Sequence, residues 1–375
     1  MAAVSSALIV GGGTTGCALA ALLVRGGVAV DIAEIKSDWT VRGSGITVQG
    51  NALRVLDEIG VWPQVRERGF PFDGLGLRSR TGELLLDVPE QRTGGPDLPG
   101  TAGMNRPQLA AVLSEEAQRA GASVRLGVTV DALDQDESGV DVTFDDGSAG
   151  RYGLVVGADG IRSHVRSLLG IALAPRPTGM SIWRVHARRP PTLDRTDLCY
   201  DGPCYIAGYC PTSDDTLYAY LAEDTRERAH LPRAEQLEIV RELASAYGGH
   251  WDAIRADLTN PENINYTTFE SLLLPPPWHR GRVVLVGDAA HACPPTLAQG
   301  AAMCLEDASV LAELVLGADR LDDVLWRAFT ERRFERVRAI VEGSLQLVRW
   351  LLDDDGGAEV PTLMGRITEM VREPA

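Results

Sequence analysis

The sequence predicts an α/β protein: a Rossmann-like domain interrupted by an antiparallel β-sheet module and followed by C-terminal helices. Three observations lead to this prediction. A strand, a glycine-rich turn, a helix and a second strand follow one another up to residue 34. Residues 175–275 are rich in proline, tyrosine and tryptophan and contain strand-like alternation. Apolar residues at helical spacing then dominate the last third of the chain.

The first 34 residues form the predicted βαβ unit. Residues 6–10 (SALIV) and 28–34 (VAVDIAE) are apolar runs that predict parallel strands, and the helix between them ends at a glycine pair. The turn GGGTTG fits G-x-G-x-x-G with Gly11, Gly13 and Gly16. The first glycine allows the turn, the second lets a pyrophosphate approach the backbone, and the third lets helix and strand pack closely.

The same unit predicts a dinucleotide site. Thr14 and Thr15 open the helix, where free N–H groups and the positive end of the helix dipole favour phosphate. Glu34 ends the second strand, where an acid binds the ribose hydroxyls. A glycine-rich turn without a ligand is the alternative interpretation, and Glu34 argues against it. The motif alone leaves NAD and FAD open.

Bulk composition restricts the partners. The 375 residues carry a formal net charge of −16, which disfavours nucleic acid and anionic membranes. No apolar run approaches the about 18 residues of a membrane-spanning helix. The start MAAVSSALIV lacks the basic region of a secretory signal, so we expect a cytoplasmic protein with reduced thiols. The six cysteines match no zinc spacing, and no metal is expected.

Two further motifs carry a family resemblance. They are VVGADGIRSHVR at 155–166 and GRVVLVGDAAHACPPTLAQGAAMCLEDA at 281–308. With the glycine turn and Glu34, these motifs resemble those of the flavin-dependent aromatic hydroxylases of the para-hydroxybenzoate hydroxylase type. Weaker matches at 43–60 and 105–113 fit in order, so the likeness covers nearly all of residues 6–340. It implies non-covalently bound FAD.

The resemblance also implies a domain division. A discontinuous FAD-binding domain takes residues 1–70, 100–174 and 276–340. A substrate-binding sheet domain takes 71–99 and 175–275, and a C-terminal helical segment takes 341–375. The sheet domain is expected to cover the flavin. A monomer or a homodimer is expected.

The Gly-Asp motif implies contacts with the reactive half of FAD. Asp288 would accept hydrogen bonds from the ribityl chain, and capping of a turn is its alternative role. Pro295 would lie beside the isoalloxazine. The helix that opens at Gly300, Ala301 and Ala302 would point its N–H groups at the N1–C2=O edge, where reduced flavin carries negative charge. His291 is interpreted as structural.

Other residues are assigned to FAD through the same resemblance. Arg106 would reach the phosphate and ribose region, with an exposed surface arginine as the alternative. The loop of Asp159 would approach the pyrophosphate, and direct contact by its side chain stays open. Val130 would offer its backbone to the adenine. Arg42 matches loosely, near the expected path of the chain past the flavin.

The implied chemistry is monooxygenation. NAD(P)H reduces FAD, O2 adds at C4a, and the resulting hydroperoxide transfers oxygen to an electron-rich aromatic molecule. No second G-x-G-x-x-G is present, so NAD(P)H is expected as a transient co-substrate, and the choice between NADH and NADPH stays open. Candidates for substrate contact are Arg184, Tyr209, Tyr218 and Thr47. Arg184 could hold a carboxylate or phenolate, and Thr47 stands where 6-hydroxynicotinate monooxygenases have a histidine.

Several alternatives remain at this point. The tyrosines could form a packed aromatic face, and Arg184 could be an exposed arginine. A monooxygenase of the same fold could act on a polyketide or antibiotic by hydroxylation, epoxidation or Baeyer–Villiger oxidation. A non-oxygenating flavoprotein or an NAD-dependent oxidoreductase is disfavoured by the Gly-Asp motif. The halogenase pattern W-x-W-x-I-P is absent from the sequence.

Overall fold

The computed structural model describes residues 2–39, 44–355 and 359–375 and confirms the α/β prediction. Its first layer is a six-stranded sheet of order β18-β19-β12-β1-β2-β8, parallel except for the β18 edge. The strands are β1 (Ser6–Val10), β2 (Ala29–Glu34), β8 (Ser123–Leu126), β12 (Leu154–Gly157), β18 (His279–Arg280) and β19 (Val283–Leu285). Continuous burial of β12 and β19 is typical of strands covered on both faces.

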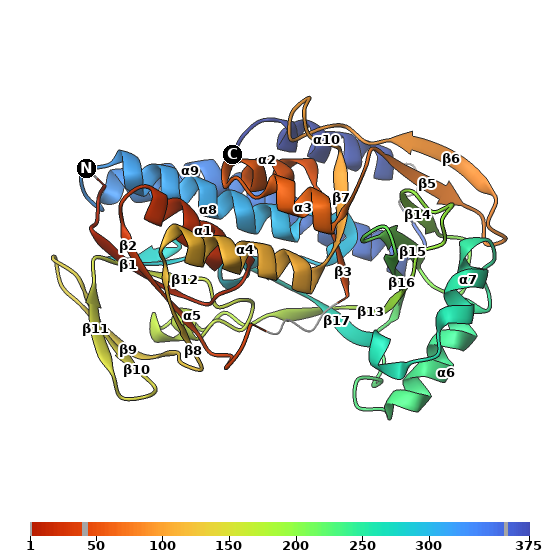
Figure 1. Ribbon diagram of the computed structural model, residues 1–375, viewed down its shortest axis with the longest axis horizontal. Helices are drawn as coiled ribbons and strands as arrows, with labels where there is room; N and C mark the ends of the chain where they lie inside the picture. Colours follow the sequence, from red (N-terminus) through yellow and green to blue (C-terminus); the bar gives the residue numbers. More distant parts are fainter. Residues whose placement is uncertain (1, 40–43, 356–358) are drawn as a thin grey trace.

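Helices cover the parallel sheet. Figure 1 shows α1 lying beside α8 and α4, with the long α9 alongside α8. The helices of this domain are α1 (Thr14–Arg25), α2 (Gly50–Glu58), α3 (Trp62–Arg68), α4 (Arg106–Ala120), α5 (His164–Leu168), α8 (Gly300–Gly317), α9 (Asp323–Leu352) and α10 (Val360–Arg372). Helices α2 and α3 are separated at Gly60, whose φ of +79° suits glycine.

A second layer is an eight-stranded sheet of order β20-β17-β13-β16-β15-β14-β5-β6. It comprises β5 (Gly74–Arg78), β6 (Leu84–Pro89), β13 (Arg176–Arg188), β14 (Thr196–Cys199), β15 (Ile206–Pro211), β16 (Thr216–Asp224), β17 (Ile264–Leu273) and β20 (His291–Ala292). Helices α6 (Arg233–Ala244) and α7 (His250–Asp257) pack on one face through a separate apolar core. Figure 1 shows this helix pair at the end of the molecule opposite β9–β11.

Two three-stranded sheets complete the fold, of order β3-β7-β4 and β11-β10-β9. Their strands are β3 (Gly45–Gln49), β4 (Phe70–Phe72), β7 (Thr101–Asn105), β9 (Val130–Gln135), β10 (Val140–Phe144) and β11 (Ala149–Tyr152); the 3-10 turns are η1 (Pro261–Asn263), η2 (Gly287–Ala289) and η3 (Pro295–Leu297). A Cβ on Gly103 would lie 1.8 Å from the Pro211 carbonyl oxygen. Glycine therefore lets the β3-β7-β4 sheet press directly against β15 and β16.

The described ranges also limit other classes of site. None of their helices combines the length and apolarity that crossing a membrane requires. Within the same ranges, no cluster of three or more His, Cys, Asp or Glu side chains could hold a metal ion. All six cysteines are free thiols.

Candidate cofactor and substrate site

The glycine turn has the shape that a dinucleotide needs. Gly11 has a φ of +105°, and a Cβ there would lie 2.4 Å from the Ala158 carbonyl oxygen. A Cβ on Gly16 would lie 2.0 Å from the Gly11 carbonyl oxygen, so the third glycine is required for contact between α1 and β1. A Cβ on Gly13 would meet nothing within 4 Å. The turn is therefore packed on two sides and open at Gly13, where a pyrophosphate would approach.

The N-terminus of α1 also suits an anion. Gly13 is its N-cap, no side chain caps it, and its first turn contains no acid. Glu34 at the end of β2 accepts hydrogen bonds from the Gly12 N–H (2.8 Å) and the Lys36 N–H (3.0 Å). Its carboxylate is thus fixed beside the turn, with lone pairs left for ribose hydroxyls. Thr14 opens the helix, and the buried Thr15 hydroxyl faces Gly287.

Asp288 lies in η2 directly after β19. Its side chain is open to solvent, yet surrounding protein raises its pKa by desolvation, and His291 and Arg106 oppose that rise. An accessible carboxyl that is desolvated by its neighbours lies in a recess rather than on an open surface. The Cys304 thiol approaches its Oδ1 at 3.6 Å. This position fits an acceptor for a ligand hydroxyl chain.

Arg106 connects the cofactor end to the substrate end. It begins α4, its side chain is exposed, and its backbone N–H donates to the Ser44 carbonyl at 3.0 Å. Its charge opposes the rise in pKa that burial causes at Asp288 and Tyr218, and it adds to the fall in the pKa of Arg184. The structure therefore brings these four predicted residues into one electrostatic neighbourhood.

The Pro-Pro turn leads into α8. Pro295 is exposed in η3, and Ala298 then adopts a left-handed conformation with a φ of 53°. The α8 N-cap, Gln299, makes no side-chain cap, and the first turn has no acid. The N–H groups at Gly300, Ala301 and Ala302 thus have no capping side chain. This helix N-terminus, uncapped like that of α1, fits the electron-rich edge of a flavin.

Three of the predicted cofactor residues are less directly placed. The Asp159 carboxylate accepts bonds from the Ser163 hydroxyl and the His164 and Val165 N–H groups, at 2.7 and 2.9 Å for the latter two. It therefore holds its own loop, whose backbone packs on Gly11. Val130 starts β9 opposite Phe144. Arg42 lies outside the described residues.

Thr47 and Tyr218 meet where the β3-β7-β4 sheet contacts the eight-stranded sheet. Their hydroxyl oxygens are 2.8 Å apart, and Thr47 Oγ1 lies 3.9 Å from Cys210 Sγ. Burial raises the pKa of Tyr218 well above its usual range. Tyr218 therefore stays protonated at neutral pH and can donate or accept a hydrogen bond, but it is no base in the resting site.

Arg184 on β13 lies across from Tyr220 of β16, two register steps from the His186–Tyr218 pair and on the same face of the sheet. Its Nη1 donates to Thr267 Oγ1 at 2.6 Å. No carboxylate of the described residues forms an ion pair with it. Burial, together with the nearby charge of Arg106, lowers its pKa to about 10. A largely desolvated cation without an acidic partner is costly, which suits a site that receives an anionic ligand.

Tyr209 does not join this group, which corrects the expectation that it lies with Arg184 and Tyr218. Its ring packs edge-on against His250 and Trp251 of α7. Its hydroxyl donates to Asp197 Oδ2 at 3.1 Å. Side chains alternate along β15, so Cys210 faces Thr47 while Tyr209 faces the helices. The sequence showed the alternation within β16 but not the face of β15.

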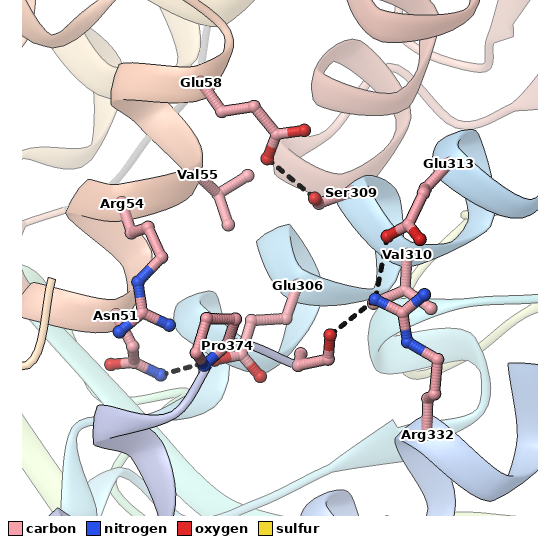
Figure 2. A pocket seen from close by; sticks show the side chains of 11 residues that line it. Asn51, Arg54, Val55, Glu58, Glu306, Ser309, Val310, Glu313, Arg332 and Pro374 are labelled. Carbon is pink, nitrogen blue, oxygen red and sulfur yellow. Dashed lines mark hydrogen bonds and ion pairs between the residues drawn. The ribbon is translucent and has the colours of Figure 1, made fainter.

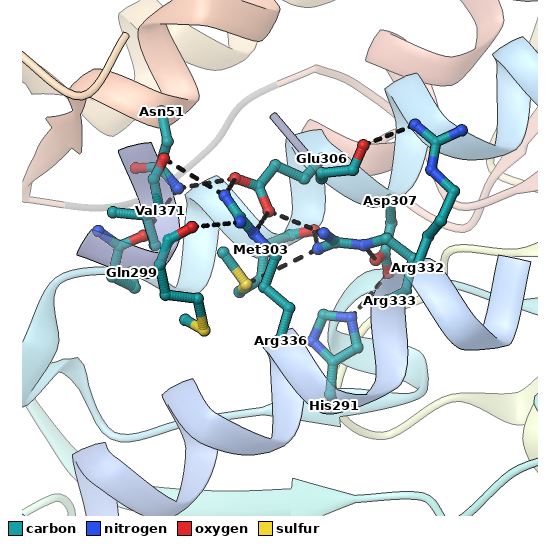
Figure 3. Close-up of polar contacts among 12 residues, drawn as sticks. Asn51, His291, Gln299, Met303, Glu306, Asp307, Arg332, Arg333, Arg336 and Val371 are labelled. Atoms are coloured by element: carbon teal, nitrogen blue, oxygen red, sulfur yellow. Dashed lines mark hydrogen bonds and ion pairs between the residues drawn. The ribbon is translucent and has the colours of Figure 1, made fainter. Parts of the chain in front are cut away.

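The contacts of His291 fit a structural role. It is buried, and its Nε2 is 2.7 Å from Asp307 Oδ2. Asp307 and Glu306 in turn bind Arg333 and Arg336 of α9 (Figure 3). Sequence reasoning missed this network. The available signal was the spacing of the two arginines, three residues apart on one helix face.

A cavity of about 220 Å³ lies between α2, α8 and the C-terminal residues (Figure 2). Its lining contains none of the predicted cofactor residues. Its polar groups largely satisfy one another: Ser309 donates to Glu58 at 2.7 Å, and Arg332 to Glu313 at 2.8 Å. We therefore place the functional site at the Gly13–Asp288 side of α8.

Comparisons with known proteins agree with this geometry. Residues 4–344 match the model of the family described as FAD binding domain. The chain is 33% identical over 342 residues to 2-heptyl-3-hydroxy-4(1H)-quinolone synthase of Pseudomonas aeruginosa, covering 88% of this chain and 86% of that protein. It is 31% identical over 349 residues to 3-amino-4-hydroxybenzoate 2-monooxygenase PtmB3 of Streptomyces platensis, covering 88% and 85%.

A solved structure shares the fold. Klebsiella pneumoniae HpxO, complexed with FAD and uric acid, superposes with a TM-score of 0.82 at 21% identity, covering 98% of this chain and 92% of that one. At this identity the likeness concerns the fold alone.

Proposed function

The chain belongs to the FAD binding domain family and is an FAD-dependent monooxygenase, and we propose that it uses NAD(P)H and O2 to hydroxylate an electron-rich aromatic small molecule. One observation supports an aromatic substrate. Arg184 and Tyr218 lie on the face of the eight-stranded sheet opposite α6 and α7, where Thr47 of β3 meets Tyr218, and both are within electrostatic reach of Arg106. We therefore assign the groups for cofactor and substrate to one recess.

In this proposal the chain's residues hold and orient the reactants. FAD, when bound and reduced, supplies the activation of O2. The α1 N-terminus would hold its pyrophosphate, Glu34 its ribose, Asp288 its ribityl chain and the α8 N-terminus its flavin edge. The eight-stranded sheet would exclude water from the flavin face, because its β16 tyrosines, Tyr218 and Tyr220, are buried or half-buried there.

The polar groups of the recess indicate which substrates fit. The guanidinium group of Arg184 can donate two hydrogen bonds to a bound carboxylate or phenolate. The protonated Tyr218 and Thr47 hydroxyls can bind a ring hydroxyl or carbonyl. Among the relatives, one is named for a hydroxybenzoate carrying an amino group and another for a quinolone. Both are aromatic rings with electron-donating substituents, which supports the same class here.

The test is substrate-dependent turnover of the FAD-loaded protein. Aromatic acids, phenols, quinolones and polyketides would be screened for stimulated NAD(P)H consumption, with product identified by mass spectrometry. We expect at least one aromatic compound to accelerate consumption and to gain one oxygen atom. If every stimulating compound were a non-aromatic polyketide, the aromatic proposal would be wrong although the enzyme class would stand.

A further inference from the structure

A buried charge network lies behind the N-terminus of α8 (Figure 3). We define it by its seven side chains, none more than 8% exposed: Asn51, His291, Gln299, Glu306, Asp307, Arg333 and Arg336. It joins α2, β20, α8 and α9. Such a network is expensive to bury, so the arrangement of its members needs a reason.

One arm of the network fastens the start of α8. Asn51 Nδ2 donates both to Gln299 Oε1 (3.0 Å) and to Glu306 Oε1 (2.9 Å). Gln299 is the α8 N-cap, and Glu306 lies in the second turn. The amide of Asn51 therefore fixes the N-cap residue to the body of the same helix. It acts beside Ala298, whose left-handed backbone sets the entry into α8.

The other arm fastens the turn that carries Asp288. Asp307 Oδ2 accepts a hydrogen bond from the Gly287 N–H at 2.8 Å and lies 2.7 Å from His291 Nε2. A Cβ on Gly287 would lie 2.4 Å from Thr15 Oγ1, so this turn also touches the start of α1. Two neighbouring carboxylates of α8 thus hold both segments assigned to the reactive half of FAD.

The two acids of the network are matched by guanidinium groups. Arg333 binds Glu306 and Asp307 at 2.8 Å each, and Arg336 binds both Glu306 oxygens, at 2.8 Å each. Two acids are therefore paired with two guanidinium groups. Glu306 lies six residues after Gly300, about 9 Å along the helix at 1.5 Å per residue. Reduction of a flavin at the helix N-terminus would create negative charge there. An unpaired unit charge about 9 Å away would change the equilibrium constant for that reduction by about tenfold.

We propose that the buried charge network positions the α8 N-terminus and keeps its positive potential uncancelled, so that the helix favours the negative charge that FAD gains on reduction. This rests on the proposed placement of the flavin edge at α8. Glu306, Asp307, Arg333 and Arg336 are positioning residues in this account, because they act through the helix and the Gly287 turn and do not touch the cofactor.

The reduction potential of bound FAD tests the proposal without any substrate. Glu306→Gln removes one negative charge and keeps the side-chain shape, so reduction should become about tenfold more favourable, or about 30 mV for two electrons. Arg336→Gln leaves a negative charge unpaired, so the potential should fall by a similar amount. The double variant should return toward the wild-type value.

Arg338→Gln is the matched control. Arg338 lies on the same helix, is exposed, and pairs with Glu335 and Glu342. Solvent screens such a charge, so its removal should leave the potential unchanged. Thermal unfolding of each FAD-loaded variant separates lost stability from a shifted potential.

The outcomes separate cleanly. Opposite shifts for Glu306→Gln and Arg336→Gln support the proposal, whereas unchanged potentials or shifts of the same sign overturn it. If Arg336→Gln does not fold, the Glu306→Gln variant decides alone: its reduction potential must rise for the proposal to stand. A wild-type protein that takes up no FAD would instead refute the cofactor assignment from which the proposed function starts.

Discussion

Substitution by alanine should affect FAD binding at Gly13 and the stability of the fold at Gly16. A Cβ at Gly16 would lie 2.0 Å from the Gly11 carbonyl oxygen, whereas a Cβ at Gly13 would meet no atom within 4 Å. Gly13 has φ −78° and ψ −167°, which alanine also adopts. Gly13→Ala should therefore leave the free energy of unfolding within about 0.5 kcal/mol of the wild type.

The binding of FAD should behave differently. The new methyl group at position 13 would occupy the opening at the α1 N-terminus, where the pyrophosphate is expected. Losing one charge-assisted hydrogen bond there costs about 1.5–3 kcal/mol, which corresponds to about ten- to a hundredfold in Kd. Gly16→Ala, by contrast, should lower stability by about 1–3 kcal/mol, the usual range for overpacking.

Urea unfolding of the FAD-free proteins and fluorescence titration with FAD would measure the two effects separately. We expect a stable Gly13→Ala protein with weakened FAD binding, and a destabilised Gly16→Ala protein. A Gly13→Ala variant that binds FAD as tightly as the wild type would show that the pyrophosphate does not approach this turn.

Three further predictions concern the acids and the substrate recess. Asp288→Asn keeps the side-chain shape and should weaken FAD binding by about 1–3 kcal/mol; an unchanged Kd would mean that Asp288 only caps a turn. Arg184→Met should lower the product formed per NAD(P)H with FAD content unaffected, while the exposed Arg188→Met on the same strand serves as control; equal coupling in all three proteins would remove Arg184 from the substrate site. Burial alone would raise the pKa of Asp307, but His291 and Arg333 outweigh it and lower the pKa to about 2. Stability should therefore fall as the pH drops from about 4 toward 2, and Asp307→Asn should lose less over that range in urea unfolding.

Local signals were sufficient for the cofactor end of the fold. Hydrophobic runs, the glycine spacing and Glu34 lie within one βαβ unit, so their geometry follows from neighbouring residues. The structure places β1, α1 and β2 as predicted, and Glu34 accepts the Gly12 N–H. The break between α2 and α3 at Gly60 follows from the same kind of local information.

Contacts between distant segments could not be predicted in the same way. Thr47 and Tyr218 meet because the β3-β7-β4 sheet packs on β15 and β16, and the alternation within one strand does not show its partner. For the same reason, the sequence did not show that Tyr209 packs against α7 and not beside Arg184 and Tyr218. Glu306 and Asp307 lie within the Gly-Asp motif, but their arginine partners lie on the next helix. In the sequence, charged residues of that helix are indistinguishable from residues exposed to solvent.

The fate of the oxygen atom tests the central claim most directly. The FAD-loaded protein would be incubated with NAD(P)H and an aromatic compound that stimulates turnover, under ¹⁸O2, and the product analysed by mass spectrometry. We expect a product that carries a single ¹⁸O atom. An oxidised product without the label, or NAD(P)H oxidation that yields only hydrogen peroxide with every aromatic compound tested, would contradict it.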